Sequence, residues 1–160
     1  MGTANLNDPW PAAGPTAGQT VGARPAMVRV EALIDGFRVV RGKPFVVRVQ
    51  INVNPGFHIN SNRPKDKYLI PTRITLDKIS GVSYGEARFP SAQDAKFQFS
   101  SEPLSAFEGE VQARIPARSL KTLPLGKKKI TGKVVYQACD NQTCFPPRTV
   151  PFEIPVEVVQ

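Results

Sequence analysis

The sequence predicts an all-β fold, an antiparallel β-sandwich preceded by a flexible tail. Three observations support this prediction. Apolar and polar side chains alternate in many short segments, and turn residues separate these segments. No segment of ten or more residues has the 3.6-residue period of an amphipathic helix. The 160-residue chain also contains 16 prolines, which disfavour long helices. We therefore expect one sandwich domain at residues 27–160, which is long enough for one hydrophobic core.

The tail is predicted at residues 1–26, which are rich in Gly, Pro, Ala and Thr and contain a single tryptophan, Trp10. Such a composition favours a disordered linker. The segment has no apolar region of the kind found in a signal peptide. We therefore expect either a cytosolic protein or a domain excised from an exported one. No apolar run approaches the ~20 residues that a membrane-spanning helix needs.

The two clearest strands are predicted at 45–53 and 150–158. In each, apolar residues occupy every second position, which is typical of a strand with one buried face. In the second, Pro151 and Pro155 fall on the outward face, which favours an edge strand. Weaker patterns predict further strands at 28–34, 36–41, 69–77, 81–88, 107–115 and 129–138.

The segment 89–106 fits no strand pattern and is predicted to be a long loop. Long loops in compact domains are often functional. Two aromatic residues, Phe97 and Phe99, lie near its tip. These rings either cover a site or only fix the loop to the core, and the pattern leaves both interpretations open.

The net charge is +8, which permits a nucleic acid, an anionic lipid or an acidic protein as a partner. The charges are scattered, and the one dense run, Lys127-Lys128-Lys129, is expected in a turn where lysines protect strand edges. The chain lacks the aromatic and arginine platform of single-stranded nucleic acid binders. A basic nucleic-acid-binding domain is therefore only a secondary alternative, and we expect no nucleic acid partner.

The only two cysteines, Cys139 and Cys144, flank a four-residue turn between a predicted strand and Pro146-Pro147. Cysteines on adjacent strands come within reach of a disulfide. A disulfide that closes so short a loop contributes only ~2 kcal/mol in the chain-entropy model. Because short or strained disulfides are the more easily reduced ones, redox exchange suits this pair better than stabilisation. The prolines would leave the sulfurs near an open sheet edge.

Three interpretations of the cysteine pair compete: disulfide exchange with a partner, an inert staple, and a metal site. Metal binding is the weakest, because two thiolates and the single histidine, His58, fall short of the four ligands usual for structural zinc. The chain has no Cys-x-x-Cys motif, so spacing alone does not identify a redox enzyme. Exchange and staple both remain open at this point.

The run from Tyr136-Gln137-Ala138-Cys139 to Cys144-Phe145-Pro146-Pro147 resembles the active-site signature of a known family. This is the N-terminal domain of DsbD, the bacterial thiol:disulfide interchange protein. Residues 55–62 and 69–72 are similar to upstream segments of that family. The likeness extends over about residues 28–158.

The resemblance implies an immunoglobulin-like sandwich in the periplasm that acts as a protein-disulfide reductase without a cofactor or metal. In the family, this domain receives electrons from a thioredoxin-like domain of the same protein. It then reduces periplasmic thioredoxin-fold proteins, such as disulfide isomerases and those of cytochrome c biogenesis. The chain would then be one domain of a larger inner-membrane enzyme of electron transport.

The resemblance also assigns roles to the cysteines. Cys144 matches the cysteine that forms mixed disulfides with partners, and Cys139 matches its resolving mate. The family has a cap loop with an aromatic tip that shields the cysteines. Phe97 is the best match for this tip, and Phe99 is the second choice.

Three further residues are predicted to lie near the site. Family members often carry aromatic residues where this chain has His58 and Asn60, and Tyr136 belongs to the cysteine signature. The main alternative function is of another class, a non-catalytic β-sandwich module for binding or structure with a stapled hairpin.

Overall fold

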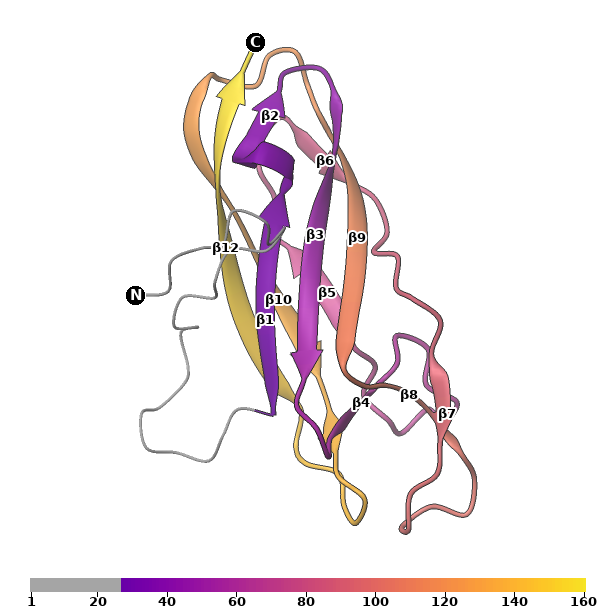
Figure 1. Ribbon diagram of the computed structural model, residues 1–160. Coiled ribbons are helices and arrows are strands. Elements are labelled where there is room, and N and C mark those ends of the chain that lie inside the picture. The colour runs from indigo at the N-terminus through magenta and orange to yellow at the C-terminus, as the bar shows by residue number, and fades with distance from the viewer. Residues whose placement is uncertain (1–26) are drawn as a thin grey trace, which may run out of the picture.

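The computed structural model describes residues 27–160, so the predicted tail at 1–26 lies outside the described residues. Two four-stranded sheets pack face to face (Figure 1). The first has the order β1 (Val28–Ile34), β3 (Pro44–Val53), β9 (Glu110–Ser119) and β6 (Val82–Tyr84). The second has the order β2 (Arg38–Val40), β12 (Arg148–Val159), β10 (Gly126–Tyr136) and β5 (Arg73–Leu76). The predicted all-β sandwich is confirmed.

The core lies between these two sheets, as the alternating pattern predicts. In β3, the inward side chains of Val47, Val49 and Ile51 are fully buried. In β10, Gly132 lets the neighbouring strands approach closely, because an added Cβ would lie 2.6 Å from both Phe152 Cζ and the Thr75 carbonyl oxygen. A side chain at this position would therefore push β5 and β12 away from β10.

The strand predicted to be an edge strand, β12, has a neighbour on its outer side, β2, but only over Glu157–Val159. β2 pairs with the end of β12 in parallel, so the sandwich is not purely antiparallel. There, Arg41 N donates to Val159 O at 2.9 Å, which shows that odd-numbered residues of β12 turn their backbone groups to this edge. Pro151 and Pro155 are also odd-numbered residues, so their backbone nitrogens face the same edge, and proline has no N–H to donate to another strand. The prolines thus protect the part of the edge that β2 leaves open.

The lysine run also differs from its predicted position. Lys127, Lys128 and Lys129 lie within β10 and pair with β12, not in a turn. The 3-10 turn η1 (Asp35–Phe37) is the one helical element of the described residues. No helix in the described part of the chain is long and apolar enough to cross a membrane.

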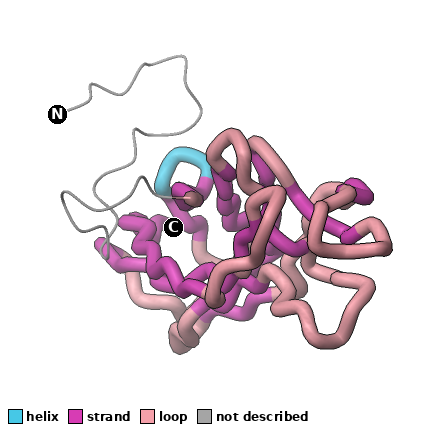
Figure 2. Tube along the Cα trace, turned by 90° about the horizontal axis from the view of Figure 1, so that it is seen from below, coloured by secondary structure: helices cyan, strands magenta, loops and turns pink. Residues whose placement is uncertain are grey.

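A third, smaller sheet lies at the lower end of the molecule in Figure 1. Its order is β11 (Ala138–Cys139), β4 (His58–Asn60), β8 (Leu104–Phe107) and β7 (Gln93–Ala95). Figure 2 looks at the molecule from this end, where loops surround the short strands. The prediction of a strand-free loop at 89–106 was wrong, because β7 and the first part of β8 lie within it. Both strands are too short for a period-two pattern and depend on pairing with each other.

Candidate functional site

The two cysteines form a disulfide at the base of a tight hairpin. They pair with each other as a single antiparallel bridge, and Phe145 N donates to Ala138 O at 2.8 Å just outside it. Inside the turn, the Asp140 carboxylate accepts hydrogen bonds from Gln142 N and Thr143 N, both at 2.8 Å. The turn chemistry of Asp140 therefore holds the hairpin that carries both sulfurs.

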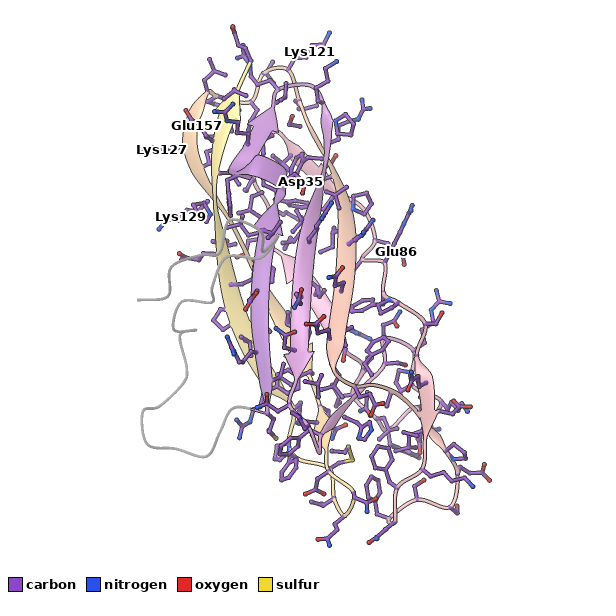
Figure 3. All side chains as sticks on the ribbon, in the orientation of Figure 1. Asp35, Glu86, Lys121, Lys127, Lys129 and Glu157 are labelled. Carbon is purple, nitrogen blue, oxygen red and sulfur yellow. A yellow bond between two sulfur atoms is a disulfide. The ribbon has the colours of Figure 1, made fainter. Side chains whose placement is uncertain are left out.

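The two cysteines differ in exposure. Cys139 is 2% exposed and belongs to a small apolar cluster with Phe97 and Leu104, whereas Cys144 is only partly buried at the rim of that cluster. In Figure 3, the yellow sulfur–sulfur bond lies at the lower end, far from the labelled Lys127 and Lys129. The lysine run thus lies away from the disulfide. Of the two cysteines, Cys144 is the more exposed.

An aromatic side chain from the loop between β7 and β8 packs in the same apolar cluster as the cysteine pair. Phe97 is 6% exposed and packs with Cys139. Phe99 is 42% exposed and stacks on Phe97, with ring centroids 5.1 Å apart. Gln98 N donates to Asn141 O at 3.2 Å, which joins the loop to the tip of the cysteine hairpin. Phe97 therefore belongs to the buried cluster around the cysteines, and Phe99 is the more exposed of the two rings.

His58 lies beside the disulfide. It is the direct partner of Cys139 in the pairing of β4 with β11. Its ring meets Phe97 edge-on at 5.0 Å between centroids, and its Nε2 lies 2.8 Å from Glu108 Oε2. The structure thus brings together His58, Phe97 and both cysteines.

Asn60 is buried two residues further along β4, and its hydrogen bonds hold neighbouring segments together. Its Nδ2 donates to Ile70 O at 2.9 Å and to Gln137 Oε1 at 3.0 Å. The same Gln137 oxygen accepts from Ile70 N at 3.1 Å. These bonds tie the segment before β5 to the strand that leads into Cys139.

Tyr136 is placed differently from the other predicted site residues. It is 2% exposed and belongs to the main core, not to the cluster around the sulfurs. Burial raises the pKa of its phenol, and the charge of Arg148 lowers that pKa by a smaller amount. Tyr136 therefore joins the hairpin to the core.

The family model for the N-terminal part of the thiol:disulfide interchange protein DsbD matches residues 27–155. The chain belongs to this family. The DsbD N-terminal domain of Neisseria meningitidis in its reduced form is 17% identical with a TM-score of 0.47, covering 69% of this chain and 77% of that one. The N-terminal periplasmic domain of ScsB from Proteus mirabilis is 12% identical with a TM-score of 0.54, covering 82% of this chain and 46% of that one. No curated protein matches.

Membership of the DsbD N-terminal family makes this chain a thiol–disulfide exchange domain. The immunoglobulin-like sandwich that the resemblance implied is confirmed. In this DsbD-type domain, the site is built from three separate segments: the cysteine hairpin, β4 and the loop that carries Phe97.

Sequence reasoning missed two residues of this DsbD-type site. Glu108 contacts His58 across the third sheet, and Gln137 supports Asn60. Gln137 stands in the cysteine signature and could have been singled out there, although its bonding partners, Asn60 and Ile70, lie far away in the chain. Glu108 carries no local signal, since its partner lies 50 positions away in the chain.

Replacing Asn60 by alanine is expected to destabilise the DsbD-type domain by ~1–3 kcal/mol, because Ile70 O and Gln137 Oε1 would lose a buried donor. Chemical denaturation measures this loss of unfolding free energy. The variant Asn62→Ala, at a partly buried position two residues away, is the control and should change stability little. Equal stability of the Asn60 variant and the wild type would contradict the supporting role.

Proposed function

We propose that this domain is a periplasmic dithiol–disulfide carrier of a larger inner-membrane enzyme. It takes electrons from a thioredoxin-like domain of the same protein and reduces disulfides of thioredoxin-fold partners. The observation that carries this proposal is the asymmetry of the disulfide. Cys139 is buried, Cys144 is partly exposed, and both lie beneath a single aromatic side chain.

The asymmetry supports a defined order of steps. In the reduced domain, the Cys144 thiolate attacks a partner disulfide, and one partner sulfur leaves as a thiolate. Cys139 then attacks Cys144 Sγ in the mixed disulfide, and the second partner sulfur leaves. The partner gains two electrons, and the domain is left with the Cys139–Cys144 disulfide. The reverse sequence, starting with a donor thiolate at Cys144, reloads the domain.

The periplasmic location is supported by the family and by the ScsB domain, which is described as periplasmic. In an oxidising compartment, exposed thiols would lose electrons to small oxidants. We propose that the Phe97 ring protects the reduced cysteines from this loss. The partners follow from the same family. Thioredoxin-fold proteins of the disulfide isomerase or cytochrome c maturation type are the proposed acceptors.

A redox titration against glutathione and dithiothreitol tests the proposal. We expect a reduction potential above about −300 mV, the region below which inert structural disulfides lie. Circular dichroism should keep the β-sheet signal after reduction, because neither sulfur belongs to the main core between the two large sheets.

The competing function, a non-catalytic module with a stapled hairpin, predicts the opposite result. A staple would resist reduction until the fold itself was lost. A potential below about −300 mV, or loss of the β-sheet signal on reduction, would favour the staple. The double variant Cys139→Ser/Cys144→Ser serves as the control for the signal of a domain without the disulfide.

A further inference from the structure

The candidate for a further role is His58, which stands next to the resolving cysteine. Directly opposed residues in an antiparallel pair project from the same face, with Cβ atoms ~4.5–5.5 Å apart. His58 and Cys139 are such a pair. Phe97 closes the group, because it packs with Cys139 and meets the His58 ring edge-on. The imidazole and the buried sulfur therefore share one small compartment.

Glu108 determines which nitrogen of the His58 imidazole is able to accept a proton. The 2.8 Å contact of its carboxylate with His58 Nε2 requires a hydrogen on that nitrogen. In the neutral ring, Nδ1 then carries the lone pair. Nδ1 is buried and has no hydrogen-bond partner in the described part of the chain. A buried polar atom without a partner calls for an explanation, and the oxidised Cys139, which has no S–H, does not supply a donor.

We propose that His58, oriented by Glu108, accepts and returns the proton of the Cys139 thiol during exchange. This inference rests on the proposed function. When the domain is reloaded, a donor thiolate attacks Cys144 Sγ, the disulfide breaks, and its electron pair goes to Cys139 Sγ. The imidazolium gives its proton to that sulfur. In the forward direction, neutral His58 takes the proton from Cys139, whose thiolate then attacks Cys144 Sγ and expels the partner thiolate.

Burial explains why Cys139 needs this help. A thiolate on a side chain that is 2% exposed lacks hydration, and burial disfavours the charged form of a thiol. Cys144 at the rim has no such requirement. The side chain of His58 is 27% exposed, so the imidazole can exchange its proton with solvent between turnovers.

The other charged groups around this compartment do not replace His58. On the hairpin, the Asp140 carboxylate is bound by two backbone N–H groups and would repel a thiolate. On the loop before Phe97, Lys96 is exposed, and Asp94 forms an ion pair with Lys65 at 2.9 Å. From the β8 side, the charge that reaches the imidazole is Glu108. The imidazole is thus the group placed to exchange a proton with Cys139.

The test separates the two sulfurs by mixing the reduced domain with dithiobisnitrobenzoate and following the coloured thiolate by stopped flow. The first phase reports attack by Cys144 on the reagent. The second phase reports attack by Cys139 on the resulting mixed disulfide. Both phases are followed from about pH 5 to pH 8.

His58→Gln is the decisive variant, because the glutamine amide can keep the contact with Glu108 but has no second nitrogen that could accept a proton. We expect its second phase to slow at least tenfold near neutral pH and to lose the pH dependence of the wild type, while the first phase is unchanged. Glu108→Gln should slow the same phase by a smaller factor. The control Glu110→Gln, an exposed carboxylate on β9, should change neither phase.

An unchanged second phase in His58→Gln would overturn the inference. If circular dichroism shows that His58→Gln is unfolded, Glu108→Gln becomes the test. An unchanged second phase in Glu108→Gln would then overturn the inference. A wild-type domain with a first phase but no second phase would contradict the proposed function itself. Failure of the function and failure of the inference are therefore distinguishable.

Discussion

Replacing Cys144 by serine is expected to abolish mixed disulfides with a partner, whereas replacing Cys139 by serine should accumulate them. Cys144 is the partly exposed sulfur, and Cys139 is 2% exposed beneath Phe97. A partner sulfur can therefore reach Cys144, and without Cys139 nothing resolves the adduct. The measurement incubates each reduced variant with an oxidised thioredoxin-fold protein and compares adducts on non-reducing gels.

The double serine variant is the matched control and should form no adduct. Mass spectrometry of the digested adduct identifies the linked cysteine. An adduct formed through Cys139 in the Cys144→Ser variant, at a yield like that of the reciprocal variant, would reverse the proposed roles. It would also mean that the order of exposure seen in the oxidised structure does not govern exchange.

Removing the Phe97 ring is expected to speed alkylation of the reduced thiols by a small reagent by an order of magnitude or more. The ring belongs to the small cluster around Cys139, so its removal opens a path to both sulfurs. The loop is joined to the hairpin tip by one backbone hydrogen bond, Gln98 N to Asn141 O, which suits a cover that must move when a partner arrives. Iodoacetamide labelling of Phe97→Ala measures the rate.

Phe99→Ala is the matched control. This ring is 42% exposed and stacks on the outer face of Phe97, so its loss should raise the rate far less. Denaturation of both variants distinguishes a cover from ordinary core, where Phe→Ala typically costs ~3–5 kcal/mol. Unchanged labelling of Phe97→Ala together with a loss of this size would show that the ring only stabilises the fold.

The position of the site in the fold separates the cysteines from the main core. The long strands β3, β9, β10 and β12 form the two large sheets, and their side chains make the main core. The cysteines lie instead in the small third sheet at one end, with their own apolar cluster. Changes in this cluster during exchange therefore need not disturb the main core.

The sequence by itself determined the strands β1, β3 and β12 and the cysteine pair. The period-two pattern predicted 28–34 to the residue as β1, and 45–53 and 150–158 to within two residues at each end as β3 and β12. Such strands bury one face along their length, so every second residue is apolar and the strand can be recognised from the sequence. The cysteine spacing was equally local, because only four residues separate the two sulfurs.

Only the tertiary structure decided what surrounds the sulfurs. The strands β4, β7 and β8 have only three or four residues each, which is too few to show a period. They form because β7 pairs with β8, and β8 pairs with β4, which lies far away in the chain. The same pairing sets His58 opposite Cys139, with Glu108 against its ring and Phe97 over both. These contacts join residues tens of positions apart in the chain. No local sequence pattern predicts them, because each contact forms only when the small third sheet has assembled at the end of the sandwich.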